Sequence, residues 1–107
     1  MKKDITPKRQ FLIDRLGYLR NRANLSAREL SLMIDKSFAY LAKFENGDFN
    51  IPCEVLIDAI EACGSTPEEF FWDDISKYKD QKQLISKFDK LSPESKQTFL
   101  DLLNNLK

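Results

Sequence analysis

The sequence predicts an all-α protein, and three observations support that fold class. Apolar residues recur at intervals of three or four positions along most of the 107 residues, as on one side of a helix. No stretch shows the sustained alternation of apolar and polar residues that marks a strand. Residues that commonly begin helices occur at six positions: Thr6, Ser26, Ser37, Pro52, Thr66 and Ser92. We therefore expect five helices over residues 6–72 and a C-terminal helical extension over residues 73–107.

The first helix is expected to begin after Thr6, which acts as N-cap, with Pro7 at the first helical position. Its buried stripe consists of apolar residues at steps of four, three and four: Leu12, Leu16, Leu19 and Ala23. Asn24 tolerates the left-handed conformation in which helices commonly end. The helix is therefore predicted to stop just before Leu25.

Residues 25–47 predict two short helices joined by a tight turn. Their apolar positions are mostly three to five residues apart: Leu25, Leu30, Ile34, Leu41 and Phe44. Ser26 and Glu29 have the spacing of a capping box at the start of the first of these helices. Ser37 is expected to cap the second. Only residues 34–36 lie between them, which is the length of the turn in a helix-turn-helix.

Two more helices are expected to complete the domain. One covers residues 52–63 and is ended by Gly64. The next begins at Thr66, with Pro67 in its first turn and Glu69 completing a capping box. We expect at least two of the three aromatic residues that follow to lie in the core: Phe70, Phe71 and Trp72. Residues 73–82 are polar and charged and predict a linker or a frayed helix.

The pattern in residues 25–47 resembles the Cro/repressor-type helix-turn-helix regulators of bacteria and phages. The matching residues are Leu25-Ser26, Glu29-Leu30-Ser31, Ser37, Leu41 and Glu45-Asn46-Gly47. The resemblance extends from about Leu16 to Phe71, roughly half of the chain. It implies a regulator of transcription, in particular a repressor, that binds double-stranded DNA sequence-specifically and inserts the second helix of the motif into the major groove. It also implies a structural ion pair between Arg20 and Glu45.

The resemblance assigns the DNA-contacting face to the N-terminal part of that second helix. The expected DNA-binding residues are Arg28, Lys36, Ser37, Phe38, Ala39, Tyr40, Lys43 and Asn46. Lys43 can donate to the acceptors of guanine, and Ser37, Tyr40 and Asn46 can donate to phosphates. Arg28 and Lys36 would flank the DNA backbone electrostatically.

Several residues depart from the pattern of the family. Phe38 stands where a polar or basic residue is common, and Asp35 replaces the glycine of the turn, which indicates a strained or differently shaped turn. An exposed cluster of Phe38, Tyr40 and Phe49 would favour an alternative function, in which the domain binds a partner protein through this aromatic face. DNA mobility assays at low and moderate salt would separate the two hypotheses.

The extension carries apolar residues on helical spacing from Leu84 to Leu106, which we expect to form a helical hairpin. Because a single helix-turn-helix reads only a few base pairs, the fold usually acts as a two-fold pair. We expect a homodimer formed through Phe88, Leu91, Phe99, Leu103 and Leu106. The alternative is that the hairpin packs within the monomer onto the first helix.

Charge and composition narrow the class of protein. Residues 1–47 contain ten Lys and Arg against five Asp and Glu, whereas the rest contains seven against twelve, so the basic half carries the motif. The sequence has no histidine, no glycine-rich phosphate loop and no activated cysteine, so it does not indicate an enzyme. We expect no metal, cofactor or small-molecule ligand. Residues 1–7 have no apolar run after the lysines, and no segment has the length of a membrane span. We therefore expect a cytoplasmic protein without a signal peptide or membrane contact.

Overall fold

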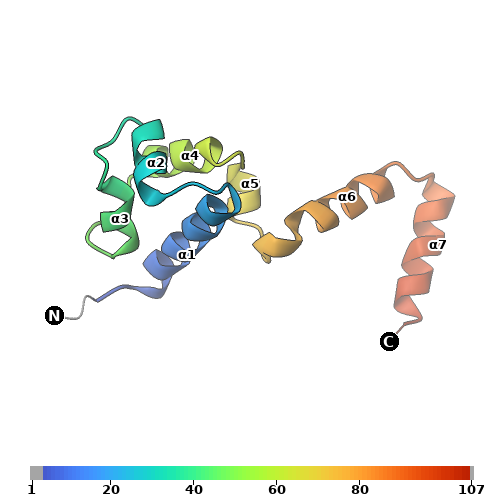
Figure 1. The fold of residues 1–107 in the computed structure, drawn as a ribbon. Coiled ribbons are helices and arrows are strands. Elements are labelled where there is room, and N and C mark those ends of the chain that lie inside the picture. Colours follow the sequence, from blue (N-terminus) through green and yellow to red (C-terminus); the bar gives the residue numbers. More distant parts are fainter. Residues whose placement is uncertain (1–3, 107) are drawn as a thin grey trace. The chain divides into compact units, whose positions relative to one another are not determined.

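A computed structural model describes residues 4–106 and shows an all-α protein, which confirms the predicted fold class. The chain divides into two compact units, one up to Ile75 and one from Ser76 onward (Figure 1). The described helices are α1 (Pro7–Arg22), α2 (Ala27–Met33), α3 (Tyr40–Glu45), α4 (Cys53–Ala62), α5 (Pro67–Phe70), a 3-10 turn (Ile75–Lys77), α6 (Tyr78–Asp89) and α7 (Pro93–Asn104).

Four of the predicted helix starts are confirmed, and each depends on a hydroxyl that accepts a backbone N–H three residues ahead. The accepting residues are Thr6, Ser26, Thr66 and Ser92. At the start of α2 the capping box is complete, because the Ser26 N–H also donates to Glu29 Oε1 at 3.0 Å. These bonds to the Ser26 backbone and hydroxyl lower the pKa of Glu29.

Two predicted starts differ from the structure. Ser37 does not cap the second helix of the motif: α3 begins three residues later, at Tyr40, and its N-cap residue is Ala39, whose side chain makes no capping hydrogen bond. Residues 37–39 instead belong to the connection from α2, where the Tyr40 N–H donates to the Ser37 carbonyl at 3.0 Å. Pro52 is the residue before α4 and not part of it.

The first four helices end in the same way, with one residue in the left-handed conformation. These residues are Asn24, Asp35, Gly47 and Gly64, with φ of 57°, 59°, 84° and 77°. After α2, the Lys36 N–H donates to the Ser31 carbonyl and the Asp35 N–H to the Leu32 carbonyl, which is the Schellman pattern. Asp35 therefore closes the motif's turn in the conformation that a glycine would adopt more easily.

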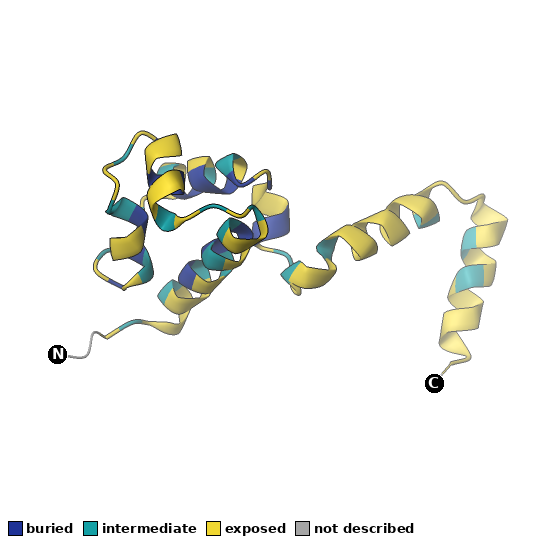
Figure 2. Cartoon of the chain, viewed as in Figure 1, coloured by how far each residue is buried: buried dark blue, intermediate teal, exposed yellow. Residues whose placement is uncertain are grey.

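The core of the first unit lies between α1 and α2–α5 (Figure 2). Its buried apolar residues are Ile13, Leu16, Leu19, Leu30, Ile34, Leu41, Phe44, Leu56, Ala59, Ile60, Cys63 and Phe70. The expectation of at least two core aromatics after Thr66 is wrong, because only Phe70 is buried while Phe71 is 58% exposed and Trp72 is half-buried. α5 ends at Phe70, so the two residues that follow do not continue its buried face.

The second unit contains α6 and α7. For residues 73–82 the sequence left open a linker or a frayed helix; the structure has a 3-10 turn over Ile75–Lys77 that leads directly into α6 at Tyr78. Lys and Gln are good helix formers, so a polar segment can form an exposed helix. The rings of Phe88 and Phe99 lie 5.5 Å apart, yet no residue of α6 or α7 is buried. Among the described residues, no helix is long and apolar enough to cross a membrane.

Candidate nucleic-acid interface

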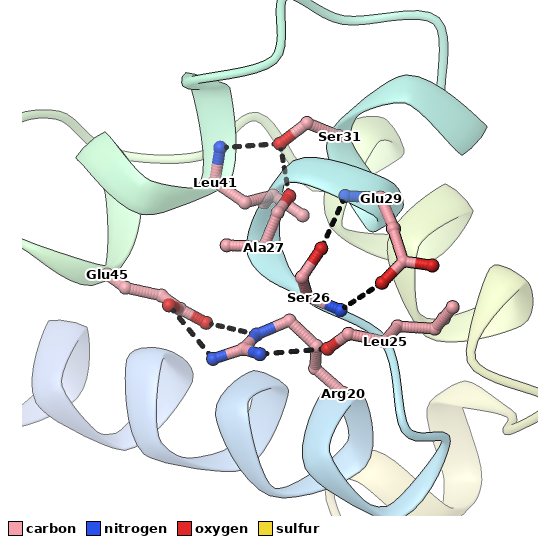
Figure 3. A network of polar contacts seen from close by, with 8 residues as sticks. All are labelled: Arg20, Leu25, Ser26, Ala27, Glu29, Ser31, Leu41 and Glu45. Carbon is pink, nitrogen blue, oxygen red and sulfur yellow. Dashed lines mark hydrogen bonds and ion pairs between the residues drawn. The ribbon is translucent and has the colours of Figure 1, made fainter.

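A buried serine joins the two helices of the motif. Ser31, on α2, is fully buried, and its Oγ accepts the backbone N–H of Leu41 at 3.0 Å (Figure 3). The same hydroxyl donates to the Ala27 carbonyl at 2.7 Å. Leu41 is the second residue of α3, so Ser31 satisfies one of the N–H groups that a helix start leaves without an intrahelical partner. α3 is thus capped from α2, ten positions away in sequence.

Arg20 ties α1 to the end of α3. Its guanidinium donates to both carboxylate oxygens of Glu45, with Nε–Oε1 at 2.8 Å and Nη2–Oε2 at 3.2 Å (Figure 3). A third bond, from Nη1 to the Leu25 carbonyl at 2.9 Å, reaches the segment that leads into α2. The two side chains are only 18% and 21% exposed. A planar, two-bond pair in this setting fixes the direction of α3 relative to α1.

A second arginine holds the loop that follows α3. Arg9, in the first turn of α1, donates from Nε to Asn50 Oδ1 at 2.5 Å and from Nη1 to the Gly47 carbonyl at 3.2 Å. α3 is therefore tied to neighbouring elements at its beginning and at its end. The sequence pattern gave no sign of this contact, because Arg9 and Asn50 are 41 positions apart.

An ion pair between Arg22 and Glu69, which the sequence pattern did not predict, fixes α5 against α1. Arg22 donates to both carboxylate oxygens of Glu69 at 2.7 and 2.8 Å, and the Ser65 hydroxyl donates to Glu69 Oε1 at 2.6 Å. Glu69 is 3% exposed, and this hydrogen bonding raises the pKa of Arg22. Arg15 donates to the carbonyl of Phe70, the last residue of α5, at 2.9 Å and to that of Asp73, just past the helix, at 2.8 Å. The Glu69 carboxylate thus accepts hydrogen bonds from Arg22 of α1 and from Ser65, the residue before the α5 N-cap.

The residues that the sequence assigns to DNA contact are spread over three elements. Arg28 lies on α2, residues 36–39 lie in the connection, Tyr40 and Lys43 lie on α3, and Asn46 directly follows it. The exposed ones are Arg28, Ser37, Phe38, Lys43 and Asn46, whereas Lys36, Ala39 and Tyr40 are half-buried. α3 has only six residues, so most of the predicted face precedes the helix.

Two cationic side chains of this surface lie against aromatic rings. The Arg28 guanidinium carbon is 5.0 Å from the centre of the Phe38 ring, and Lys36 Nζ is 5.4 Å from that of Tyr40. Such contacts stabilise a cation on the face of a ring. The first contact links Arg28 of α2 to Phe38, and the second links Lys36 of the connection to Tyr40. Both bring positive charge to the start of α3.

The predicted exposed cluster of three aromatic residues is wrong. The ring of Phe49 is 4.8 Å from that of Tyr40 and 6.0 Å from that of Phe44, and Tyr40 and Phe49 pack on the core. Phe38 alone is largely exposed, at 58%. The loop that carries Phe49 folds back onto α3, which removes the continuous aromatic face. Burial also raises the pKa of Tyr40, so its hydroxyl stays protonated and can donate a hydrogen bond.

Comparison with known proteins places this geometry in a family. Residues 16–70, just over half of the chain, match the family model described as Helix-turn-helix. The chain belongs to the helix-turn-helix family. Its members are DNA-binding regulators and not enzymes, as the sequence predicted.

Two solved structures are similar to this chain, both of the clp gene regulator ClgR from Corynebacterium glutamicum. In one, the identity is 25%, and the match covers 64% of this chain and 88% of the chain in that structure, with a TM-score of 0.56. In the other, the identity is 21%, the match covers 76% and 89%, and the TM-score is again 0.56; this second likeness supports the fold alone. A comparison with curated proteins gives no match.

Proposed function

We propose that the protein is a sequence-specific transcriptional repressor that inserts α3 into the major groove of double-stranded DNA. The observation that carries this proposal is the way α3 is held. Ser31 caps its start, Arg20 pairs with Glu45 at its end, and cationic side chains lie on the surface beside it. A rigidly held helix can present side chains to base edges in one register. The similarity to a solved gene regulator supports a role in transcription.

The exposed residues have distinct roles in this proposal. Lys43, on α3, donates to guanine O6 or N7 in the major groove. Ser37, Tyr40 and Asn46 donate to phosphates, and Phe38 and Ala39 make apolar contact with thymine methyl groups. The two flanking cations, Arg28 and Lys36, attract the backbone without reading its sequence. Repression requires only that the bound protein occupies the site that polymerase needs.

The proposal includes a homodimer formed by α6 and α7. The expected interface residues are Phe88, Leu91, Phe99, Leu103 and Leu106. Leu91, Leu103 and Leu106 are 39%, 46% and 72% exposed, and Phe88 and Phe99 are half-buried. Burying these side chains against a second copy would stabilise association by about 25 cal/mol per Å². Leu103→Glu should convert the dimer to a monomer in sedimentation, while Asn104→Glu, with the same added charge one position on, should not.

The DNA-binding test begins with selection of preferred duplexes from a random pool by the full chain. Lys43→Ala should then weaken binding to the selected site by about 1–3 kcal/mol and relax the preference at one base pair. Arg28→Ala should weaken binding to all sequences alike and make the salt dependence shallower by about 1 in the slope. If neither change affects affinity for any duplex, the proposal is wrong. Loss of a captured protein partner in Phe38→Ala would then support the interaction module.

A further inference from the structure

α6 presents two chemically different sides. Successive helical residues are about 100° apart, so Leu84, Ile85 and Phe88 lie together on one side. The opposite side carries lysines with two uncharged polar residues between them: Lys79, Lys82, Gln83, Ser86, Lys87 and, at the end of the helix, Lys90. All six of these side chains are exposed. We call this side the lysine face. It is separate from the apolar side that the proposed dimer would use.

The lysines of this face outnumber the acidic residues of α6: Lys79, Lys82, Lys87 and Lys90 stand against Asp80 and Asp89. No Asp or Glu lies three or four positions from Lys79 or Lys87. Lys79 and Lys82 are three positions apart, as are Lys87 and Lys90, and like charges at that spacing repel on a helix. The face therefore has an electrostatic reason to bind a polyanion.

The charge is also segregated along the chain. Residues 48–75 contain eight Asp and Glu and no Lys or Arg, while residues 76–107 contain seven Lys against four Asp and Glu. In the second unit positive charge therefore exceeds negative charge, and the lysines of α6 lie on one side of the helix. Such a concentration is the usual electrostatic footprint of a nucleic-acid-binding surface.

We propose that the lysine face of α6 binds the phosphate backbone of the same duplex that α3 reads, adding affinity without sequence preference. This inference rests on the proposed function. From Lys79 to Lys90 the face spans about 16 Å along the helix axis, comparable to about five nucleotides of one strand at 3.4 Å each. Lysine suits this role because its ammonium is a flexible point charge that reaches phosphates of variable geometry. The contacts would release counterions and so add to the salt dependence of binding.

The test compares the full chain with the triple variant Lys79→Gln, Lys87→Gln, Lys90→Gln. The dissociation constant for the selected duplex is measured from about 50 to 200 mM salt, with sedimentation and circular dichroism confirming an unchanged assembly and fold. We expect the slope of log affinity against log salt to become shallower by about 1–3 per protomer, since each lost phosphate contact removes about 0.9. The base-pair preference should stay the same, because these lysines do not read bases.

Two matched variants serve as controls. Replacing the same three lysines by Arg keeps the charge and should keep the slope. Lys8→Gln with Lys96→Gln removes positive charge outside the lysine face and should change the slope less for each charge removed. An unchanged slope in the Gln triple variant, or an equal change per charge in the off-face control, would overturn the inference.

Two further outcomes separate the sources of error. If the triple variant binds DNA like the unchanged chain but loses binding to vesicles rich in anionic phospholipid, the lysine face serves a membrane surface and the inference is wrong. If the unchanged chain binds no duplex even at about 50 mM salt, the proposed function fails together with the inference. Retained, sequence-selective DNA binding with an unaltered slope contradicts the inference alone.

Discussion

The substitution Ser31→Ala tests how the structure places α3. It removes the Oγ that accepts the Leu41 N–H at 3.0 Å and donates to the Ala27 carbonyl at 2.7 Å. Serine and alanine differ by one oxygen atom, and position 31 is fully buried, so the change creates little new space. The main consequence is that the Leu41 N–H, near the start of α3, loses its acceptor inside the protein.

The magnitude follows from that unsatisfied donor. A buried N–H left without an acceptor costs about 1–3 kcal/mol. Alanine favours the helix more than serine does, by roughly 0.5 kcal/mol, which offsets part of the loss. The Ala27 carbonyl loses only its additional bond from the side chain. We therefore expect Ser31→Ala to lower the free energy of unfolding by about 1–2 kcal/mol and Tm by about 5–10 °C.

Urea unfolding followed by circular dichroism measures the effect, and Ser37→Ala is the matched control. Ser37 is the residue that the sequence predicts as the cap, but in the structure Ala39 occupies the N-cap position of α3. Replacing Ser37 should therefore lower the free energy of unfolding by less than about 0.5 kcal/mol. In the DNA-binding assay, Ser37→Ala should weaken binding, because the proposed function assigns Ser37 a phosphate contact. Ser31→Ala should also weaken it, because Ser31 holds the start of α3. A larger stability loss for Ser37→Ala than for Ser31→Ala would refute the assigned start of α3.

Two further predictions concern stability and are checked by the same urea measurement. Gly17→Ala should raise the free energy of unfolding by about 0.5–1 kcal/mol, because Gly17 lies inside α1 and an added Cβ would meet no atom within 4 Å; a loss of stability would show that α1 is packed more closely there. Glu69→Ala should lower the free energy of unfolding by about 2–4 kcal/mol, because Arg22 and Ser65 lose the carboxylate to which they donate. The partial exposure of Arg22 keeps this loss below that of a fully buried pair. Glu61→Ala, an exposed control on α4, should change stability by less than about 0.5 kcal/mol, and equal effects of the two would contradict the buried network.

Sequence by itself determined the fold class and most helix starts, because these depend on interactions between near neighbours. Thr6, Ser26, Thr66 and Ser92 each accept an N–H three positions ahead, and that distance is visible in the sequence. The left-handed residue after α1 was predicted for the same reason, since the conformation of Asn24 depends on its own side chain and on the helix before it. The family pattern was recognisable because its positions keep a fixed local register.

Only the tertiary structure decided where α3 begins and how it is held. Its cap comes from Ser31 on another helix, and the pair of Arg22 with Glu69 joins residues 47 positions apart. The same holds for the aromatic residues, since the loop carrying Phe49 folds onto Tyr40 and leaves only Phe38 exposed. Contacts of this kind arise when separate elements pack around a common core. Local sequence patterns specify which elements form, but not which of their side chains meet.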